Sequence, residues 1–313
     1  MTARLTRGSG GAARLRELLD SGETIVAPGA FDPLAARLVE EAGFPAVYMT
    51  GFGTSAALLG RPDVGLLTMT EMAGNAGRIA ACVDIPVIAD ADTGYGNALN
   101  VIRTVGAYEA AGVAGIHIED QVAPKKCGHM EGKQVISAQE MAQKVRAAVE
   151  ARTNPDFVII ARTDARAVEG LERALDRARL YRRAGADVLF VEAVVTEDEA
   201  AEAARALPDV PLLFNWAEGG KTPPIGLARL RELGYRIVIF PISTLLAATA
   251  AMRGILREIA ATGTPAAVLG GLPSFGEFVD FIGLPQVLQV ERRYADDDDG
   301  PGNAWGGSGG GDI

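Results

Sequence analysis

Short runs of apolar and β-branched residues recur along the chain, and a segment with helical periodicity follows each of them. The eight runs are TIVAPGA (24–30), AVYMTG (46–51), VIADAD (87–92), GIHIED (115–120), VIIARTDA (158–165), VLFVEA (188–193), LLFNW (212–216) and RIVIFP (236–241). Glycines close the helical segments EEAG, EAAG, RRAG and RELG, which is typical of helix C-termini. Strands that alternate with helices pair in parallel, so the pattern predicts an α/β protein with a closed (β/α)8 barrel, the TIM-barrel fold.

A doubly wound open sheet is the alternative fold. Such a sheet carries a glycine-rich phosphate turn after its first strand, and PGAFDP is a poor substitute for one. After the eighth run come a helical segment at 245–261 and another stretch at 275–295. We expect residues 1–294 to form a single barrel domain, with the C-terminal helices packed outside the barrel or on a neighbouring subunit. Residues 295–313, rich in Asp and Gly, are predicted to be a disordered tail.

Composition narrows the classes of partner. The chain has 313 residues, 48% of them hydrophobic, and a formal charge of −10. Neither nucleic acid nor an anionic membrane suits this charge, since both select basic patches. The two cysteines, Cys82 and Cys127, fit neither a disulfide framework nor a zinc site, which favours a reducing, cytoplasmic setting. We find no apolar stretch long enough for a signal peptide or a membrane span.

Polar side chains fall near the ends of five successive predicted strands, from the third to the seventh. They are Asp90, Asp92, His117, Glu119, Arg162, Glu192 and Asn215. A charge inside a parallel strand is costly to bury without a partner or a metal ion. Because the carboxyl ends of the strands carry the active site of a (β/α)8 barrel, we expect these side chains to converge.

The spacing of these residues suggests a metal ion. Side chains two positions apart on a strand share a face, which places Asp90 with Asp92 and His117 with Glu119. Carboxylates on adjacent strand ends repel one another unless a cation lies among them. Oxygen ligands favour Mg²⁺ or Mn²⁺ over zinc, and we interpret His117 as a hydrogen-bonding support. The alternative is that Asp-Ala-Asp ends a strand and caps the next helix.

The loop after the fourth strand contains KKCGHMEGK (125–133), with two glycines that give it mobility. A mobile loop at this face is typical of an active-site lid. Basic neighbours favour the thiolate of Cys127, which makes this residue a candidate acid, base or nucleophile. An incidental loop cysteine is the alternative. The loops that contain TGFGTSAALLGRPDVG and NWAEGGKTP are candidate anion sites.

Together these segments resemble the isocitrate lyase and phosphoenolpyruvate mutase superfamily, from about residue 12 to 294. The motifs are YMTGFG with GRPDVG, DADTGYGN, GIHIEDQVAPKKCGH, IIARTDA, FVEA and NWAEGGKTP. The resemblance implies a (β/α)8 barrel, a Mg²⁺ ion, and 2-oxo or 2-hydroxy acid substrates. It also implies a homotetramer, a dimer of dimers in which a C-terminal helix is exchanged between subunits.

The resemblance further implies roles for individual positions. The implied metal site comprises Asp90, Asp92, Glu119 and Asp63. The implied substrate site comprises Tyr48, Thr50, Gly51, Phe52, Asp90, Gly128, His129, Arg162, Glu192 and Asn215. The implied catalytic groups are Cys127, Arg162, Glu119, Tyr48 and His129. Among these Cys127 matches the acid, and the base stays open between Tyr48 and Glu119.

The implied reaction is retro-aldol cleavage of a 2-alkylmalate or methylisocitrate to a 2-oxo acid such as pyruvate and a carboxylate. Alternatives are carboxyphosphonoenolpyruvate phosphonomutase, which has a similar KRCGH lid, oxaloacetate hydrolase, and a barrel that has lost catalysis. The lid cysteine argues against phosphoenolpyruvate mutase itself. Pro241, where a serine is expected, argues against the hydrolase, and Phe52 replaces a usually small residue, which implies a smaller or flatter substrate near C3.

Overall fold

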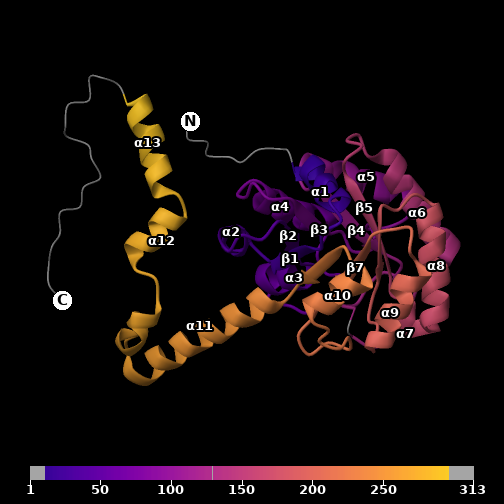
Figure 1. Cartoon of the computed structure of the whole chain (residues 1–313). Coiled ribbons are helices and arrows are strands. Elements are labelled where there is room, and N and C mark those ends of the chain that lie inside the picture. The colour runs from indigo at the N-terminus through magenta and orange to yellow at the C-terminus, as the bar shows by residue number, and fades with distance from the viewer. Residues whose placement is uncertain (1–10, 129, 296–313) are drawn as a thin grey trace. The chain divides into compact units, whose positions relative to one another are not determined.

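The computed structural model describes residues 11–128 and 130–295 (Figure 1). These residues belong to two compact units, which divide between Met252 and Arg253. The first unit contains a closed barrel of eight parallel strands, in which each strand pairs with the next and the last pairs with the first. The predicted (β/α)8 barrel is therefore confirmed, and the open sheet is excluded by the pairing of Val26 with Val238.

The strands are β1 (Ile25–Ala30), β2 (Val47–Met49), β3 (Val87–Asp90), β4 (Gly115–Glu119), β5 (Val158–Thr163), β6 (Val188–Val191), β7 (Leu212–Asn215) and β8 (Ile237–Phe240). The helices of the barrel unit are α1 (Gly11–Asp20), α2 (Pro33–Glu41), α3 (Gly51–Leu59), α4 (Met69–Ala80), α5 (Ala98–Ala110), α6 (Ala138–Ala151), α7 (Arg166–Glu169), α8 (Leu171–Arg183), α9 (Glu197–Ala206) and α10 (Leu227–Leu233). α11 (Ser243–Thr262) begins in this unit and ends in the next.

Local sequence explains where the elements begin and end. Asp32 caps α2 by accepting a hydrogen bond from Ala35 N, and Thr68 and Glu71 form a capping box at α4. Gly234 ends α10 with φ 89°, a left-handed conformation that glycine adopts without strain. The predicted strand 46–51 proved too long, because the backbone turns into α3 at Thr50.

Two apolar layers hold the barrel together. Inward side chains of the strands fill the lumen, and outward side chains pack against the surrounding helices. α1, which the sequence pattern did not predict, places Leu15 and Leu19 in the inner cluster with Ile25 and Val158. Arg16 Nε donates to the carbonyl of Asp156 at 3.1 Å, just before β5 begins. The helix therefore closes the end of the barrel where the strands start.

The second unit is described over residues 253–295. After α11, which covers the predicted helical segment 245–261, it contains a 3-10 helix (Ala266–Gly271) that was not predicted, and α12 (Phe275–Phe281) and α13 (Leu284–Tyr294), which lie within the predicted stretch 275–295. Large apolar side chains such as Phe275 are exposed there. Exchange of these helices between subunits stays a prediction, as does a single domain over 1–294, and 296–313 lie outside the described residues. No described helix is both long and apolar enough to span a membrane.

We expect Gly115→Ala to lower the free energy of unfolding by about 1–3 kcal/mol. A Cβ atom at this position in β4 would lie 2.6 Å from Val158 O and 2.7 Å from Val158 Cβ in β5. Urea unfolding measures the change. Gly106→Ala in α5 is the control, since an added Cβ there meets nothing within 4 Å and a gain of at most about 1 kcal/mol is expected. Equal stability of the two variants would contradict the tight contact between β4 and β5.

Candidate active site

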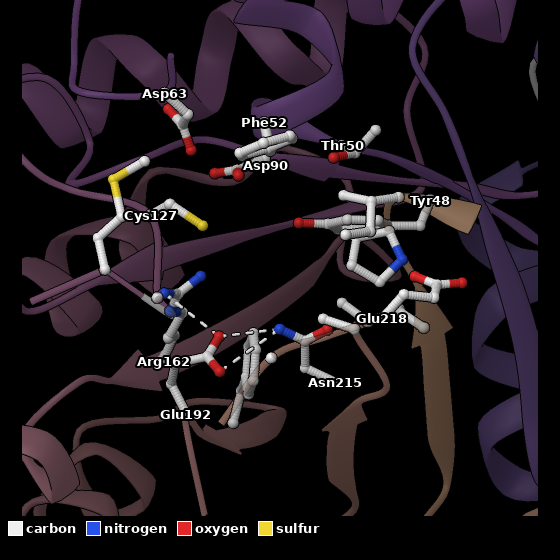
Figure 2. Close-up of a pocket in the computed structure, with 18 of the residues that line it drawn as sticks. Tyr48, Thr50, Phe52, Asp63, Asp90, Cys127, Arg162, Glu192, Asn215 and Glu218 are labelled. Atoms are coloured by element: carbon white, nitrogen blue, oxygen red, sulfur yellow. Dashed lines mark hydrogen bonds and ion pairs between the residues drawn. The ribbon is translucent and has the colours of Figure 1, made fainter. Parts of the chain in front are cut away.

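A cavity of about 210 Å³ lies at the carboxyl ends of the barrel strands (Figure 2). Of the residues predicted from the sequence, it brings together Tyr48, Thr50, Phe52, Asp63, Asp90, Cys127, Gly128, Arg162, Glu192 and Asn215. Gly51, Asp92 and Glu119 do not line the cavity. Gly51 lies between Thr50 and Phe52 in the sequence, whereas Asp92 and Glu119 form ion pairs with the lining residues Lys125 and Arg162. His129 lies outside the described residues.

Asp90 and Asp92 stand at the end of β3 and are both buried. Asp90 Oδ1 accepts a hydrogen bond from Asp92 N at 2.9 Å. Gly51 approaches Asp90 so closely that a Cβ atom at that glycine would lie 2.3 Å from Asp90 Oδ2. Burial raises the pKa of Asp92 to about 6, with further increases from Asp90 and Asp63. The strand end therefore concentrates negative charge in a region of low solvent access.

Lys125 compensates part of this charge. Its Nζ atom lies 2.6 Å from Asp63 and 2.8 Å from Asp92 Oδ1, and the side chain is 4% exposed. Burial alone would lower the pKa of Lys125, but the surrounding carboxylates, Asp92 first, raise it well above its usual value. Sequence reasoning did not assign this lysine to the site, because nothing in PKKC signals that a loop lysine is buried.

Glu119 stands at the end of β4 and is fully buried. Neither of its side-chain oxygens has a hydrogen-bond partner within the described part of the chain, although Arg162 Nη1 lies 3.3 Å from Oε2. Burial raises the pKa of Glu119 well above its ordinary value. A buried carboxyl group with unused oxygens suits either a proton or a cation.

The acidic residues fit a hydrated Mg²⁺ better than a dehydrated metal. Within residues 11–128 and 130–295, no three Asp, Glu, His or Cys side chains are grouped so that they could hold a metal directly. Mg²⁺ usually takes one or two carboxylates and keeps several waters. Asp90, Asp92, Asp63 and the unused oxygens of Glu119 are the donors that such an ion would find here.

Tyr48 and His117 form a buried pair beside Asp90. Tyr48 OH lies 2.7 Å from His117 Nε2, and the two rings stack with centroids 5.8 Å apart. Burial lowers the pKa of His117 to about 4, despite Asp90 Oδ1 at 3.5 Å. Burial likewise raises the pKa of Tyr48 well above 10. Both groups are therefore neutral at pH 7, and His117 supports Tyr48 by hydrogen bonding.

Arg162, from β5, is the cation on the other side of the cavity. Its Nε and Nη2 atoms donate to the carboxylate of Asp164 at 3.0 and 3.1 Å. Nη2 also lies 3.3 Å from Glu192 Oε2, which accepts from Asn215 Nδ2 at 3.1 Å (Figure 2). The guanidinium lies over the ring of Phe190, 5.1 Å from its centroid. Its orientation is thus fixed by several partners.

The loop after β4 lines one side of the cavity and so covers it from that side, and its role as a mobile lid stays a prediction. Cys127 and Met130 line the cavity from this loop, and Cys127 N donates to Asp63 O at 3.1 Å. Cys127 is not in a disulfide. A Cβ atom at Gly128 would lie 2.6 Å from Arg162 Nη2 and 2.6 Å from Glu192 Cδ. Only a glycine lets the loop backbone lie directly on these two side chains.

The barrel and its acidic cavity at the strand ends define the class of α/β barrel proteins that act on small molecules at this face. The sequence model of the phosphoenolpyruvate phosphomutase family matches residues 15–260 of the chain. The chain therefore belongs to this family. The resemblance to the isocitrate lyase and phosphoenolpyruvate mutase superfamily is therefore confirmed.

Two relatives cover nearly all of the chain, and both are lyases. The 2,3-dimethylmalate lyase of Eubacterium barkeri is 49% identical over 284 residues, which are 91% of this chain and 98% of the relative. The 2-methylisocitrate lyase of Aeropyrum pernix is 49% identical over 282 residues, which are 90% of this chain and 89% of the relative.

Two solved structures extend the comparison. Oxaloacetate acetylhydrolase in complex with 3,3-difluorooxalacetate superimposes with a TM-score of 0.86 and 41% identity, over 91% of this chain and 97% of the other. Phosphonopyruvate hydrolase in complex with oxalate and Mg²⁺ gives a TM-score of 0.83 and 36% identity, over 90% of this chain and 98% of the other.

We expect His117 to stay uncharged well below neutral pH. Its pKa is about 4 in the fold, whereas an unfolded histidine has a pKa of about 6.5. Unfolding in this range takes up a proton, so the stability from His117 is complete above about pH 6.5 and is lost as the pH falls toward 4. The variant His129→Gln retains His117 as its one histidine. NMR of its imidazole signals over a pH series without divalent cations measures the pKa of His117. A titration midpoint near pH 6.5 would contradict the burial argument.

Proposed function

We propose that this protein is a Mg²⁺-dependent carbon-carbon lyase. Its substrate is a 2-hydroxy di- or tricarboxylate of the 2-alkylmalate or methylisocitrate type, and its products are a 2-oxo acid such as pyruvate and a carboxylate. One observation carries the proposal: Cys127 lines the same cavity as Asp90 and Arg162. A proton donor, an acidic site for a cation and a fixed guanidinium are thus placed around one small molecule.

The acidic end of the cavity holds the 2-oxo acid part of the substrate. Asp90 and Asp92, with Asp63 and Glu119 around them, are the residues that would hold Mg²⁺. Bound there, the ion would supply positive charge that stabilises the 2-oxo acid. Tyr48 and Thr50, which line the cavity next to Asp90, orient this part of the substrate.

The chain's own groups move the protons. The base stays open between Tyr48 and Glu119, since burial raises the pKa of both groups. Loss of the 2-hydroxyl proton forms the 2-oxo group, the C2–C3 bond breaks, and its electrons collect on the second carboxylate fragment. Arg162 stabilises this developing charge. The Sγ–H group of Cys127 then donates the proton to the carbon that lost the bond.

The fragment that leaves also meets apolar walls. Phe52, Phe190, Met130 and Pro241 line the cavity together with the polar groups. These side chains suit a short alkyl substituent at C3, and the ring of Phe52 limits its size. This supports 2,3-dimethylmalate as a better fit than the larger methylisocitrate.

A panel of substrates tests the proposal. With Mg²⁺, 2,3-dimethylmalate or methylisocitrate should release pyruvate, as followed by coupling to lactate dehydrogenase, and EDTA should abolish the signal. Phosphorus NMR on carboxyphosphonoenolpyruvate runs in parallel. A new carbon-phosphorus signal without pyruvate would support a phosphonomutase instead. No turnover, and no rise in melting temperature with Mg²⁺ and oxalate, would support a non-catalytic barrel.

Oxaloacetate belongs in the same panel, because a solved oxaloacetate acetylhydrolase is 41% identical to this chain. That reaction requires water to be activated at the cavity. Pro241, which lines this part of the cavity, offers no hydroxyl group to a water or to a hydrated substrate. Formation of oxalate and acetate at a rate above that of pyruvate release would overturn the lyase assignment.

Cys127→Ser should lower the cleavage rate by about 10²- to 10⁴-fold, because a hydroxyl is a much weaker proton donor than a thiol. The rise in melting temperature with Mg²⁺ and oxalate should stay, since the site for the 2-oxo acid is unchanged. Cys82→Ser is the matched control. Cys82 follows α4, and its Sγ lies 3.1 Å from Ile79 O, away from the cavity. Unchanged turnover in Cys127→Ser would remove the thiol from the mechanism.

The tetramer and the exchanged C-terminal helices belong to the proposal as well. They are supported by the membership in the family and by exposed apolar side chains on α12 and α13, such as Phe278 and Leu288. Sedimentation analysis of the full chain measures the assembly. A monomer at micromolar concentration would contradict this part of the proposal.

A further inference from the structure

Lys133, at the end of the loop that covers the cavity, is a buried cation that the proposed chemistry does not use. Its side chain is 2% exposed, and its Nζ atom donates to Asp164 Oδ1 at 2.7 Å. The same ammonium group donates to the carbonyl oxygen of Gly128 in a short hydrogen bond. One group therefore links the covering loop to the end of β5.

Asp164 is the partner that connects Lys133 to Arg162. Its carboxylate receives two bonds from the Arg162 guanidinium in the side-by-side geometry that fixes an arginine most firmly. Burial would raise the pKa of Asp164, but Arg162 and Lys133 hold it below its ordinary value. The carboxylate is therefore charged while it is fully buried.

Asp164 is itself fixed from behind. Its backbone N donates to Asp120 Oδ1 at 2.9 Å. The other oxygen of Asp120 accepts from Thr163 Oγ1 at 2.7 Å and from Tyr181 OH at 2.7 Å. Ile136 N, just after the loop, donates to Asp120 O at 2.9 Å. The ends of β4 and β5, α8 and the loop exit thus meet at one buried residue, Asp120.

The loop touches Arg162 directly at the residue that Lys133 holds. Gly128 is packed against the guanidinium and Glu192 so closely that a Cβ atom would overlap both. Gly128 follows Cys127, and both line the cavity. The carbonyl that Lys133 binds therefore belongs to the residue that follows Cys127 and that packs against the arginine.

We propose that Lys133 is a positioning residue that couples the covering loop to Arg162. Lys133 links Gly128 to Asp164, and Asp164 in turn holds the guanidinium of Arg162. The thiol of Cys127 therefore stays over the cavity only while Arg162 keeps its two bonds to Asp164. For turnover this inference rests on the proposed lyase function. The coupling itself is a property of the contacts and can be measured without a substrate.

Lys133→Met should loosen the loop and leave the barrel folded. Asp164 keeps its two bonds to Arg162 in this variant, so no buried carboxylate is left without a cation. The variant loses the hydrogen bonds from Lys133 Nζ to the carbonyl of Gly128 and to Asp164 Oδ1, which together connect the loop to the end of β5. Lys133→Arg keeps a cation and several donors, and should preserve the tie.

Alkylation of Cys127 by iodoacetamide measures the position of the loop. In a Cys82→Ser background Cys127 is the chain's one cysteine, and intact mass gives the rate. Lys133→Met should raise the rate about tenfold, which is the loss expected for one charge-assisted hydrogen bond. Lys126→Gln is the matched control, because Lys126 Nζ also donates to loop carbonyls, those of Glu131 and Gly132. Because Lys126 adjoins Cys127 and its charge changes the fraction of thiolate, rates are compared per thiolate from the pH dependence of alkylation, and the rate of Lys126→Gln should then match that of the background.

Gly128→Ala is a second route to the same state, since the added methyl group pushes the loop off Arg162 without touching Lys133. It too should raise the alkylation rate, and circular dichroism and melting temperature check that each variant is folded. Equal rates in Lys133→Met and Lys126→Gln, or a background rate in a folded Gly128→Ala, would overturn the coupling.

The kinetic arm separates positioning from simple structural support. Lys133→Met should raise KM and lower kcat together, while Lys133→Arg restores most of both. If Lys133 had a purely structural role, Lys133→Met would lower the melting temperature but leave KM and kcat unchanged at temperatures where the variant is folded. That result would also overturn the proposal. Should no substrate of the panel be turned over, the lyase assignment fails while the alkylation rates still decide the role of Lys133.

Discussion

The balance between buried carboxylates and a few buried cations is the constraint on which the rest of this cavity depends. Lys125 lies between Asp63 and Asp92, and Arg162 lies among Asp164 and Glu119. A buried ion pair that loses one partner destabilises a protein by about 3–5 kcal/mol, so these cations are as necessary to the fold as to the site. The carboxylates still outnumber them. Under the proposed function, a divalent cation compensates the remaining negative charge.

The hydrophobic pattern predicted most of the fold, because the strands of a parallel sheet are buried on both faces and therefore appear in the sequence as continuous apolar runs. The eight predicted runs overlap β1 to β8. The pattern failed where short-range chemistry decides the structure. Thr50 ends β2 early, since its hydroxyl accepts from Gly53 N and starts α3. α1 was missed because it is stabilised by the packing of Leu15 and Leu19 against the inner side chains of the barrel. This contact depends on the tertiary structure and leaves no local signal in the sequence.

The candidate site was predictable in part for a similar reason. Residues at strand ends, such as Asp90 and Arg162, have positions fixed by the barrel, so the rule for the carboxyl face located them. Asp164 was within reach, because it lies two positions after Arg162 and side chains two apart share a face. Lys125 and Lys133 were not, since the burial of a loop lysine is decided by carboxylates that only the tertiary structure brings near.

The closure of the barrel by α1 has a consequence for access to the cavity. Among the described residues, Leu15 and Leu19 fill the end of the barrel where the strands start, whereas the loop that carries Cys127 lines the cavity at the opposite end. Under the proposed function, both products therefore leave past this loop, so its opening sets a common upper limit on the rate of their release.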